Sequence, residues 1–174
     1  MHAVDVALQT RQEVADYLSK DADTPVSMMA ESLGRSEGQV TLALPDDMVK
    51  TVDGNHAQYV LEALPEWGKV TTIVHSFGSI FEAKATFPKG KVAHGFYNLM
   101  GKDGELHGHL RLENVQHVCF VSKPFRGMES HYIAFFTEGL ECVFKIYLGR
   151  DKKRQLLEGQ VEKFYALKKE LTNE

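Results

Sequence analysis

Cysteine is scarce in this sequence, and several features that define common protein classes are missing. Only Cys119 and Cys142 occur among 174 residues, and they form no Cys-x-x-Cys pair, so we expect neither a disulfide framework nor a zinc knuckle. No apolar run approaches the roughly 18 residues of a membrane span, and the start MHAVD lacks a basic region followed by an apolar one. We therefore expect a cytoplasmic protein that is neither exported nor inserted in a membrane.

The sequence also has no excess of positive charge. Its 20 Lys and Arg residues are outnumbered by 24 Asp and Glu residues, which gives a formal net charge of −4. Because non-specific affinity for nucleic acid comes mainly from cationic side chains that release counterions, nucleic acid is not an expected partner. Catalytic signatures are missing too: there is no Gly-x-Ser-x-Gly elbow, phosphate-binding loop, His-Glu-x-x-His or dinucleotide fingerprint. Nucleophilic hydrolysis and nucleotide chemistry therefore have no support.

Histidine, in contrast, is abundant. The chain has 8 histidines in 174 residues, about twice the share expected of an average protein. The apolar fraction of 43% and the charged fraction of 25% are ordinary for a soluble globular protein, and the length suits one domain with a real core. We interpret the histidine excess as a first indication of iron chemistry.

Helical signals occupy both ends of the chain. Gly34 is placed to end one helix, and Ser36 with Gln39 forms a capping-box pattern at the start of the next, over residues 37–44. Apolar residues at helical spacing predict the other helices at residues 6–18, 26–33, 54–64 and 151–171.

The two helices around Gly34 have the outline of a DNA-binding helix-turn-helix. The second helix, however, offers no Lys or Arg to reach base edges or phosphates, and Asp46 and Asp47 follow it directly. We therefore interpret these helices as a packing motif that covers one end of a sheet.

Between the helical ends the pattern is that of an antiparallel sheet. Glycine-containing hairpin turns at 101–104 and 137–139 join β-branched, aromatic or alternating segments. The fold class is therefore α+β, with a single domain over 1–174: small N-terminal helices (1–65), a large antiparallel meander (66–150) and a C-terminal helix packed on the sheet (151–174). The seven predicted strands are residues 70–75, 79–87, 93–100, 106–115, 117–122, 131–137 and 140–148.

Alternation along the strand over 106–115 separates a polar face from an apolar face. His107, His109 and Arg111 share one face, while the leucines of this segment share the other. Two imidazoles and a guanidinium can supply an iron ligand and a partner for a propionate. The alternative is that all three are ordinary solvated sheet residues.

Other positions are candidates for the same chemistry. His94 and Tyr97 fall on opposite faces of the strand over 93–100, with Tyr97 on the apolar side. A tyrosinate can ligate ferric haem, although a tyrosine in a strand is more commonly a packing residue with a satisfied hydroxyl. His75 ends the strand over 70–75, where a side chain can emerge at a sheet edge or pocket mouth.

Several ordered segments resemble one known family. They are residues 66–75 (EWGKVTTIVH), 94–99 (HGFYNL), 104–110 (GELHGHL), 125–128 (FRGM) and 148–157 (LGRDKKRQLL). Within a stretch from about residue 26 to residue 167, they resemble the cytosolic haem-utilisation carriers of the HutX/ChuX-like group. The resemblance implies small N-terminal helices with a large antiparallel sheet, a fold similar to one half of the larger bacterial haem-handling proteins, and a homodimer.

The resemblance also implies a function. Such a protein binds haem b, iron protoporphyrin IX, as cargo after uptake, and delivers it to a haem-degrading enzyme or buffers free haem. His75 and His109 match histidines associated with haem in the family, and Tyr97 falls where some members offer a tyrosine. These three residues are therefore alternative iron ligands, and His94 and Arg111 complete the expected haem-binding set.

Two other functions compete with a carrier that has no catalytic residues. A haem-degrading enzyme of the haem oxygenase type needs a pocket that activates oxygen and a reductase partner. A helix-turn-helix regulator that responds to haem needs salt-sensitive binding to DNA, against which the acidic second helix argues. We expect a carrier rather than an enzyme.

Overall fold

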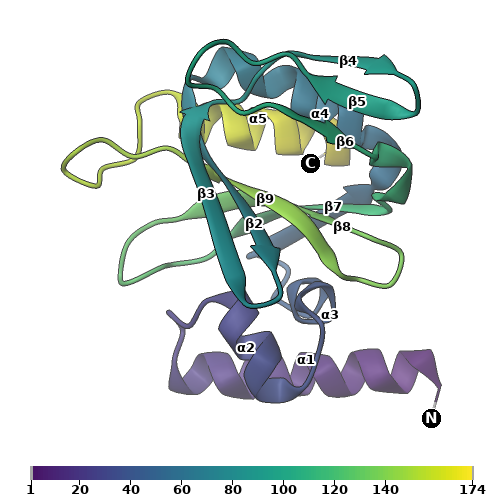
Figure 1. The fold of residues 1–174 in the computed structure, drawn as a ribbon. Coiled ribbons are helices and arrows are strands. Elements are labelled where there is room, and N and C mark those ends of the chain that lie inside the picture. Colours follow the sequence, from purple (N-terminus) through teal and green to yellow (C-terminus); the bar gives the residue numbers. More distant parts are fainter. Residues whose placement is uncertain (1, 174) are drawn as a thin grey trace.

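The computed structural model describes residues 2–173, which form helices at both ends of the chain and strands between them (Figure 1). The α-helices are α1 (Ala3–Lys20), α2 (Val26–Leu33), α3 (Glu37–Leu42), α4 (Ala57–Ala63) and α5 (Gln160–Thr172). Short 3-10 helices are η1 (Gly54–His56), η2 (Leu64–Trp67) and η3 (Leu112–Asn114). The strands are β1 (Val49–Asp53), β2 (Lys69–Ser76), β3 (Ser79–Thr86), β4 (Gly90–Ala93), β5 (Phe96–Leu99), β6 (Gly108–Leu110), β7 (His117–Ser122), β8 (His131–Phe136) and β9 (Cys142–Leu148).

The strands form two antiparallel sheets. The large sheet has the order β1-β7-β8-β9-β2-β3, and the small sheet has the order β4-β5-β6. The predicted α+β class is confirmed, and so is the antiparallel pairing. The prediction of one continuous meander is wrong because β3 ends before Phe87-Pro88, and a proline has no N–H to continue a ladder. The chain then starts a separate sheet.

Local turn chemistry changes the limits of several predicted elements. The predicted strand over 93–100 is interrupted by His94 (φ 54°) and Gly95 (φ 81°), the two central positions of the turn that joins β4 to β5. The predicted helix over 151–171 begins only at Gln160, because Asp151 Oδ1 accepts hydrogen bonds from the backbone N–H groups of Lys153 and Gln155 and holds a turn. The strand over 106–115 shortens to β6, and β1 and β4 were not predicted.

The large sheet is covered on both faces. In β8, Ile133 and Phe135 point to one face and pack in a core that includes Phe164 of α5, which confirms that the C-terminal helix packs on the sheet. Tyr132 and Phe136 point to the other face, where a second core joins them to α1, α2 and α3. Figure 1 shows these layers: the small sheet with α4 and α5 on one side, and α1 to α3 on the other.

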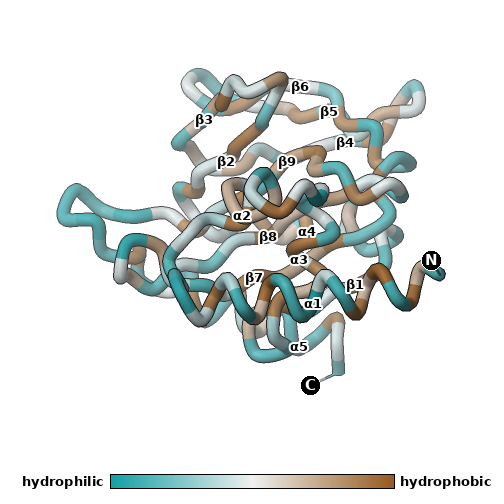
Figure 2. Tube along the Cα trace, turned by 90° about the horizontal axis from the view of Figure 1, so that it is seen from below, coloured by the Kyte–Doolittle hydropathy of each residue, from teal (hydrophilic) through white to brown (hydrophobic). Residues whose placement is uncertain are grey.

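The N-terminal helices have the predicted caps. Gly34 adopts the left-handed conformation (φ 64°) at the end of α2. Ser36 Oγ accepts from the Gln39 N–H at 3.1 Å, and Gln39 Oε1 accepts from the Ser36 N–H at 2.8 Å, which completes the capping box. Met29 and Val40 are fully buried against the sheet, as a packing motif requires. Figure 2 views the molecule from the side of α1, which crosses this layer on the outside.

None of the helices within residues 2–173 combines the length and the apolar character needed to cross a membrane.

Candidate functional site

The small sheet has a buried face and an open face. Tyr97 and Leu99 of β5 point inward and are buried in the core beside α4. Phe96 and Asn98 point to the opposite face, where Asn98 is paired with His109 of β6. This alternation confirms the predicted apolar side of Tyr97 and places the exposed His109 on the open face.

Asn98 fixes the orientation of the His109 ring on this open face. The Asn98 Nδ2 group faces three backbone carbonyls, those of Lys91 (3.0 Å), Ala93 (3.1 Å) and Phe96 (3.3 Å), so it must be the donor side of the amide. The Asn98 Oδ1 atom therefore accepts from His109 Nδ1 at 2.6 Å. In neutral His109 the proton is then on Nδ1, and Nε2 keeps its lone pair, which is the form that ligates a metal.

Arg111 lies next to His109 through a shared contact with Phe96. The Arg111 guanidinium stands 4.3 Å from the centre of the Phe96 ring, and the same ring lies 6.0 Å from the His109 imidazole in an edge-to-face arrangement. Arg111 also forms an exposed ion pair with Glu113 at 3.1 Å. The predicted face of His109 and Arg111 is therefore present, whereas His107 lies in the loop before β6 and His94 lies exposed in the β4–β5 turn.

Tyr97 has different surroundings from the histidines. Its side chain is 2% exposed, and its hydroxyl faces the Gly90 backbone without a hydrogen bond of good geometry to any described residue. Gly90 packs so closely on the Tyr97 ring that a Cβ at that position would lie 2.2 Å from the ring. Burial, with a smaller contribution from the charge of Glu62, raises the pKa of the phenol. Tyr97 would have to leave the core before it could reach an iron atom outside the small sheet.

His75 lies on the large sheet, away from the other candidates. It is exposed near the end of β2, where it is paired with Ile80 of β3. Figure 1 shows that the β2–β3 hairpin extends toward α2 and α3, whereas the small sheet lies at the other end of the molecule. The structure therefore separates His75 from the group on the small sheet, which consists of His94, Phe96, Tyr97, His109 and Arg111.

A buried ion pair sets the electrostatics around His75. Lys145 of β9 and Glu37 of α3 are joined at 2.6 Å, with side chains that are 5% and 12% exposed. Partial burial lowers the pKa of His75, Lys145 lowers it further, and Glu37 acts in the opposite direction. Near neutral pH the His75 imidazole is therefore predominantly uncharged, as a metal ligand must be.

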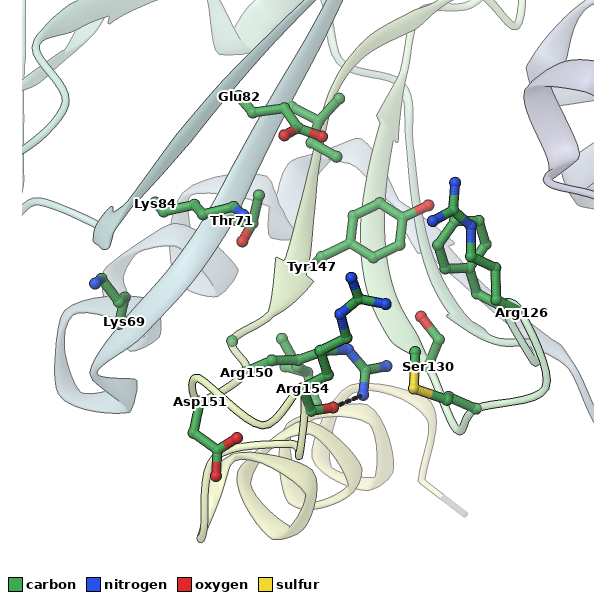
Figure 3. Close-up of a pocket in the computed structure, with 15 residues that line it drawn as sticks. Lys69, Thr71, Glu82, Lys84, Arg126, Ser130, Tyr147, Arg150, Asp151 and Arg154 are labelled. Atoms are coloured by element: carbon green, nitrogen blue, oxygen red, sulfur yellow. Dashed lines mark hydrogen bonds between the residues drawn. The ribbon is translucent and has the colours of Figure 1, made fainter.

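A pocket of about 400 Å³ opens on the same large sheet (Figure 3). Side chains of β2, β3 and β9 form its floor, and the β7–β8 loop and the loop after β9 form its sides. Five of the side chains that line it are cationic, and two, Glu82 and Asp151, are acidic. The cationic residues are Lys69, Lys84, Arg126, Arg150 and Arg154.

The residues that line the pocket were not among the predicted site residues, because they come from segments far apart in the chain. A signal was nevertheless present in the sequence. Arg126, Arg150 and Arg154 lie in the segments FRGM and LGRDKKRQLL, both of which carry the family resemblance. Asn98 was also missed, since nothing in a single strand indicates that its amide holds a histidine on the next strand.

Similarity to known proteins identifies the class of this protein, which is that of the haem-utilisation proteins. The model of the family described as haem utilisation ChuX/HutX matches residues 50–167, which is more than half of the chain. This chain therefore belongs to the ChuX/HutX haem-utilisation family.

Individual relatives agree with this assignment. The chain is 58% identical over 160 residues to the intracellular heme transport protein HutX of Vibrio cholerae serotype O1, covering 92% of this chain and 83% of that protein. It is 33% identical to the heme-binding protein ChuX, whose structure is solved, with a TM-score of 0.82 over 91% of this chain and 99% of ChuX. The fold also matches 46% of apo-PhuS from Pseudomonas aeruginosa, over 92% of this chain (TM-score 0.73, 14% identity). The expected likeness to one half of a larger haem-handling protein is confirmed at the level of the fold.

Proposed function

We propose that this protein binds haem b as cargo and carries it within the cytoplasm to a haem-degrading enzyme, buffering free haem on the way. The observation that carries the proposal is the pair of exposed imidazoles, His75 and His109, in a chain so similar to a protein named as a heme transporter. Burial and Lys145 favour the neutral form of His75, and Asn98 orients the neutral form of His109. A porphyrin supplies the equatorial ligands of its iron, so one such imidazole is enough.

His75, His109 and Tyr97 are alternative iron ligands in this proposal. The histidines are accessible, whereas Tyr97 is buried, which ranks the histidines first. Arg111 is the candidate partner of a haem carboxylate at the small sheet, and His94 is a further ligand candidate in the adjoining turn.

Titration with ferric haem tests the proposal. The wild-type protein is expected to bind with a Soret band that saturates at a fixed stoichiometry. Single His75→Ala, His94→Ala, His109→Ala and Tyr97→Phe variants should change the Soret position or the affinity in at least one case. If all four variants matched the wild type, the site assignment would be wrong, and if the wild type did not saturate, haem binding itself would be excluded.

The proposal is that of a carrier and not of an enzyme. A carrier must hold haem without activating oxygen on it, so adding a reductant in air should leave the Soret band of the complex intact. A haem-degrading enzyme bleaches the band and releases iron under the same conditions. The carrier should also lose its haem to an acceptor, for which apomyoglobin is a convenient probe before a haem-degrading enzyme is used.

A homodimer is part of the proposal, and the β2–β3 hairpin supports it. β3 is an edge strand of the large sheet, and the hairpin exposes apolar side chains of Val74, Phe77 and Phe81. Val74 and Phe81 are paired across the hairpin and so form one apolar surface. Light scattering should report a dimer for the wild type and a monomer for Phe81→Lys. Leu8→Lys on α1, at a residue exposed to a similar degree, is the matched control and should stay dimeric.

A further inference from the structure

The cationic pocket and His75 lie on one face of the large sheet. The side chains of Thr71 and Ile73 line the pocket, and His75 follows them on the same face because alternate residues of a strand point the same way. At about 3.3 Å per residue, Ile73 is about 7 Å and Thr71 about 13 Å from His75 along β2. The pocket is therefore the direct continuation of the surface that carries this imidazole.

The neighbouring strands carry the same row of side chains. In β3, Lys84 is paired with Thr71, Glu82 with Ile73, and Ile80 with His75. Since paired residues of an antiparallel ladder point to the same face, the row passes from an apolar and imidazole end at the hairpin to a cationic end in the pocket. Ile80 is 60% exposed, so the end near His75 presents apolar surface to solvent.

Positive charge dominates the inner end of this row. Five cationic side chains converge on the pocket in a protein whose formal net charge is −4. One of the two opposing carboxylates, that of Asp151, already accepts backbone N–H groups of its own turn. The other, Glu82, lies at the end of the pocket nearer His75, as its pairing with Ile73 requires (Figure 3).

Part of this charge is held in place before any ligand arrives. The Arg150 guanidinium donates from Nη1 to the Arg154 carbonyl at 3.0 Å and from Nη2 to the Glu129 carbonyl. These bonds link the two loops that flank the pocket. Tyr147 also lines the pocket (Figure 3), and its ring stacks on Tyr132 at 4.6 Å between ring centres, which gives the floor a flat aromatic surface.

We propose that this pocket holds the carboxylates of the haem whose iron is bound by His75. The inference rests on the proposed function and adds to it the residues that hold the propionates, foremost Lys84 and Arg126. An imidazole, an apolar strip and a cationic pocket follow one another in the order in which haem presents its iron, its ring and its propionates. The span from His75 to the pocket also matches the reach of a propionate from the iron.

The test compares haem with haem dimethyl ester, in which both propionates are esterified and uncharged. The wild type is expected to bind haem more tightly than the ester. In the double variant Lys84→Gln/Arg126→Gln, haem affinity should fall about 10- to 100-fold, as the loss of charge-assisted hydrogen bonds predicts. Affinity for the ester should stay within about threefold of the wild type, because no charged partner is lost. The matched control is Lys102→Gln/Lys152→Gln, two exposed lysines outside the pocket, and it should bind both ligands like the wild type.

The outcomes separate this inference from the proposed function. If the wild type bound neither ligand, the proposed function would fail. If the wild type bound haem and the pocket variant kept its preference for haem over the ester, the carboxylates would lie elsewhere and the inference would be overturned. A loss of that preference in Lys91→Gln, on the open face of the small sheet, would place the carboxylates beside His109 and would also overturn it.

Discussion

The two exposed imidazoles of this protein are presented by different surfaces. His109 lies on the open face of a three-stranded sheet, where Asn98 orients its ring and Arg111 is already engaged with Glu113. His75 lies at the end of a row that leads into a cationic pocket of about 400 Å³. An exposed imidazole is available in both places, but within residues 2–173 only His75 adjoins a concave site lined by several cationic side chains that could hold the haem carboxylates. The comparison teaches that an accessible imidazole alone does not define a haem site, because the haem carboxylates also need partners.

The largest expected effect comes from removing the two histidines separately. His75→Ala should lower haem affinity about 100-fold. Removing a residue that only supports a metal ligand lowers affinity by up to about 100-fold, and His75 is the proposed ligand itself. His109→Ala should lower it less, and the double variant should lose imidazole ligation altogether. Soret-monitored titration and the spin-state bands measure all three. The reverse ranking would transfer the site to the small sheet.

A change of pH should affect the His75 site next. Iron competes with a proton for the imidazole, and the lowered pKa of His75 keeps the ring neutral at pH values where an ordinary histidine, with a pKa of about 6.5, is already half protonated. Haem affinity should therefore be flat from pH 8 to about 6.5 and fall about tenfold per unit only below the lowered pKa. In His75→Ala this dependence should disappear. A fall that begins above pH 6.5 would contradict the assigned direction.

Substitution of Tyr97 tests whether the buried face of the small sheet takes part in haem binding. Because its buried hydroxyl makes no hydrogen bond of good geometry, Tyr97→Phe should raise the free energy of unfolding by about 1 kcal/mol. Haem affinity and the Soret position should be unchanged. Denaturant unfolding and haem titration of the same sample give both values. A shifted Soret band would show that Tyr97 leaves the core to ligate iron.

Asn98 is expected to affect haem binding less than either histidine does. Asn98→Ala removes the acceptor that holds the proton on His109 Nδ1, so the neutral ring should become a mixture of tautomers, visible in nitrogen-15 spectra of the imidazole. Haem affinity should fall by less than about tenfold, the lower end for partners of a metal ligand. A larger loss would mean that His109 is the main ligand.

Local signals in the sequence identified much of the fold. The capping box at Ser36 and Gln39 and the glycine after α2 act within a few residues, so the sequence alone was enough to predict them. The alternation that buries Tyr97 and exposes His109 is equally local. The division into two sheets was not predicted, because it depends on which strands pair across the whole chain once β3 ends.

The candidate site was predicted only in part for the same reason. His75 was identified as a residue at a strand end, but its relation to the pocket depends on the pairing of β2 with both β3 and β9. The pocket joins Lys69 to Arg154, residues that are far apart in the chain. No window of the sequence contains them together, so their convergence could be recognised only in the fold.

Paramagnetic broadening of the amide spectrum tests the central claim, that haem binds at His75, most directly. High-spin ferric haem broadens amide signals near the iron, and gallium protoporphyrin, which is diamagnetic, serves as the reference. The account predicts selective broadening in β2 and β3 around His75, with the pocket residues next and β5 and β6 unaffected. Broadening centred on Asn98 and His109, with β2 and β3 unchanged, would contradict it.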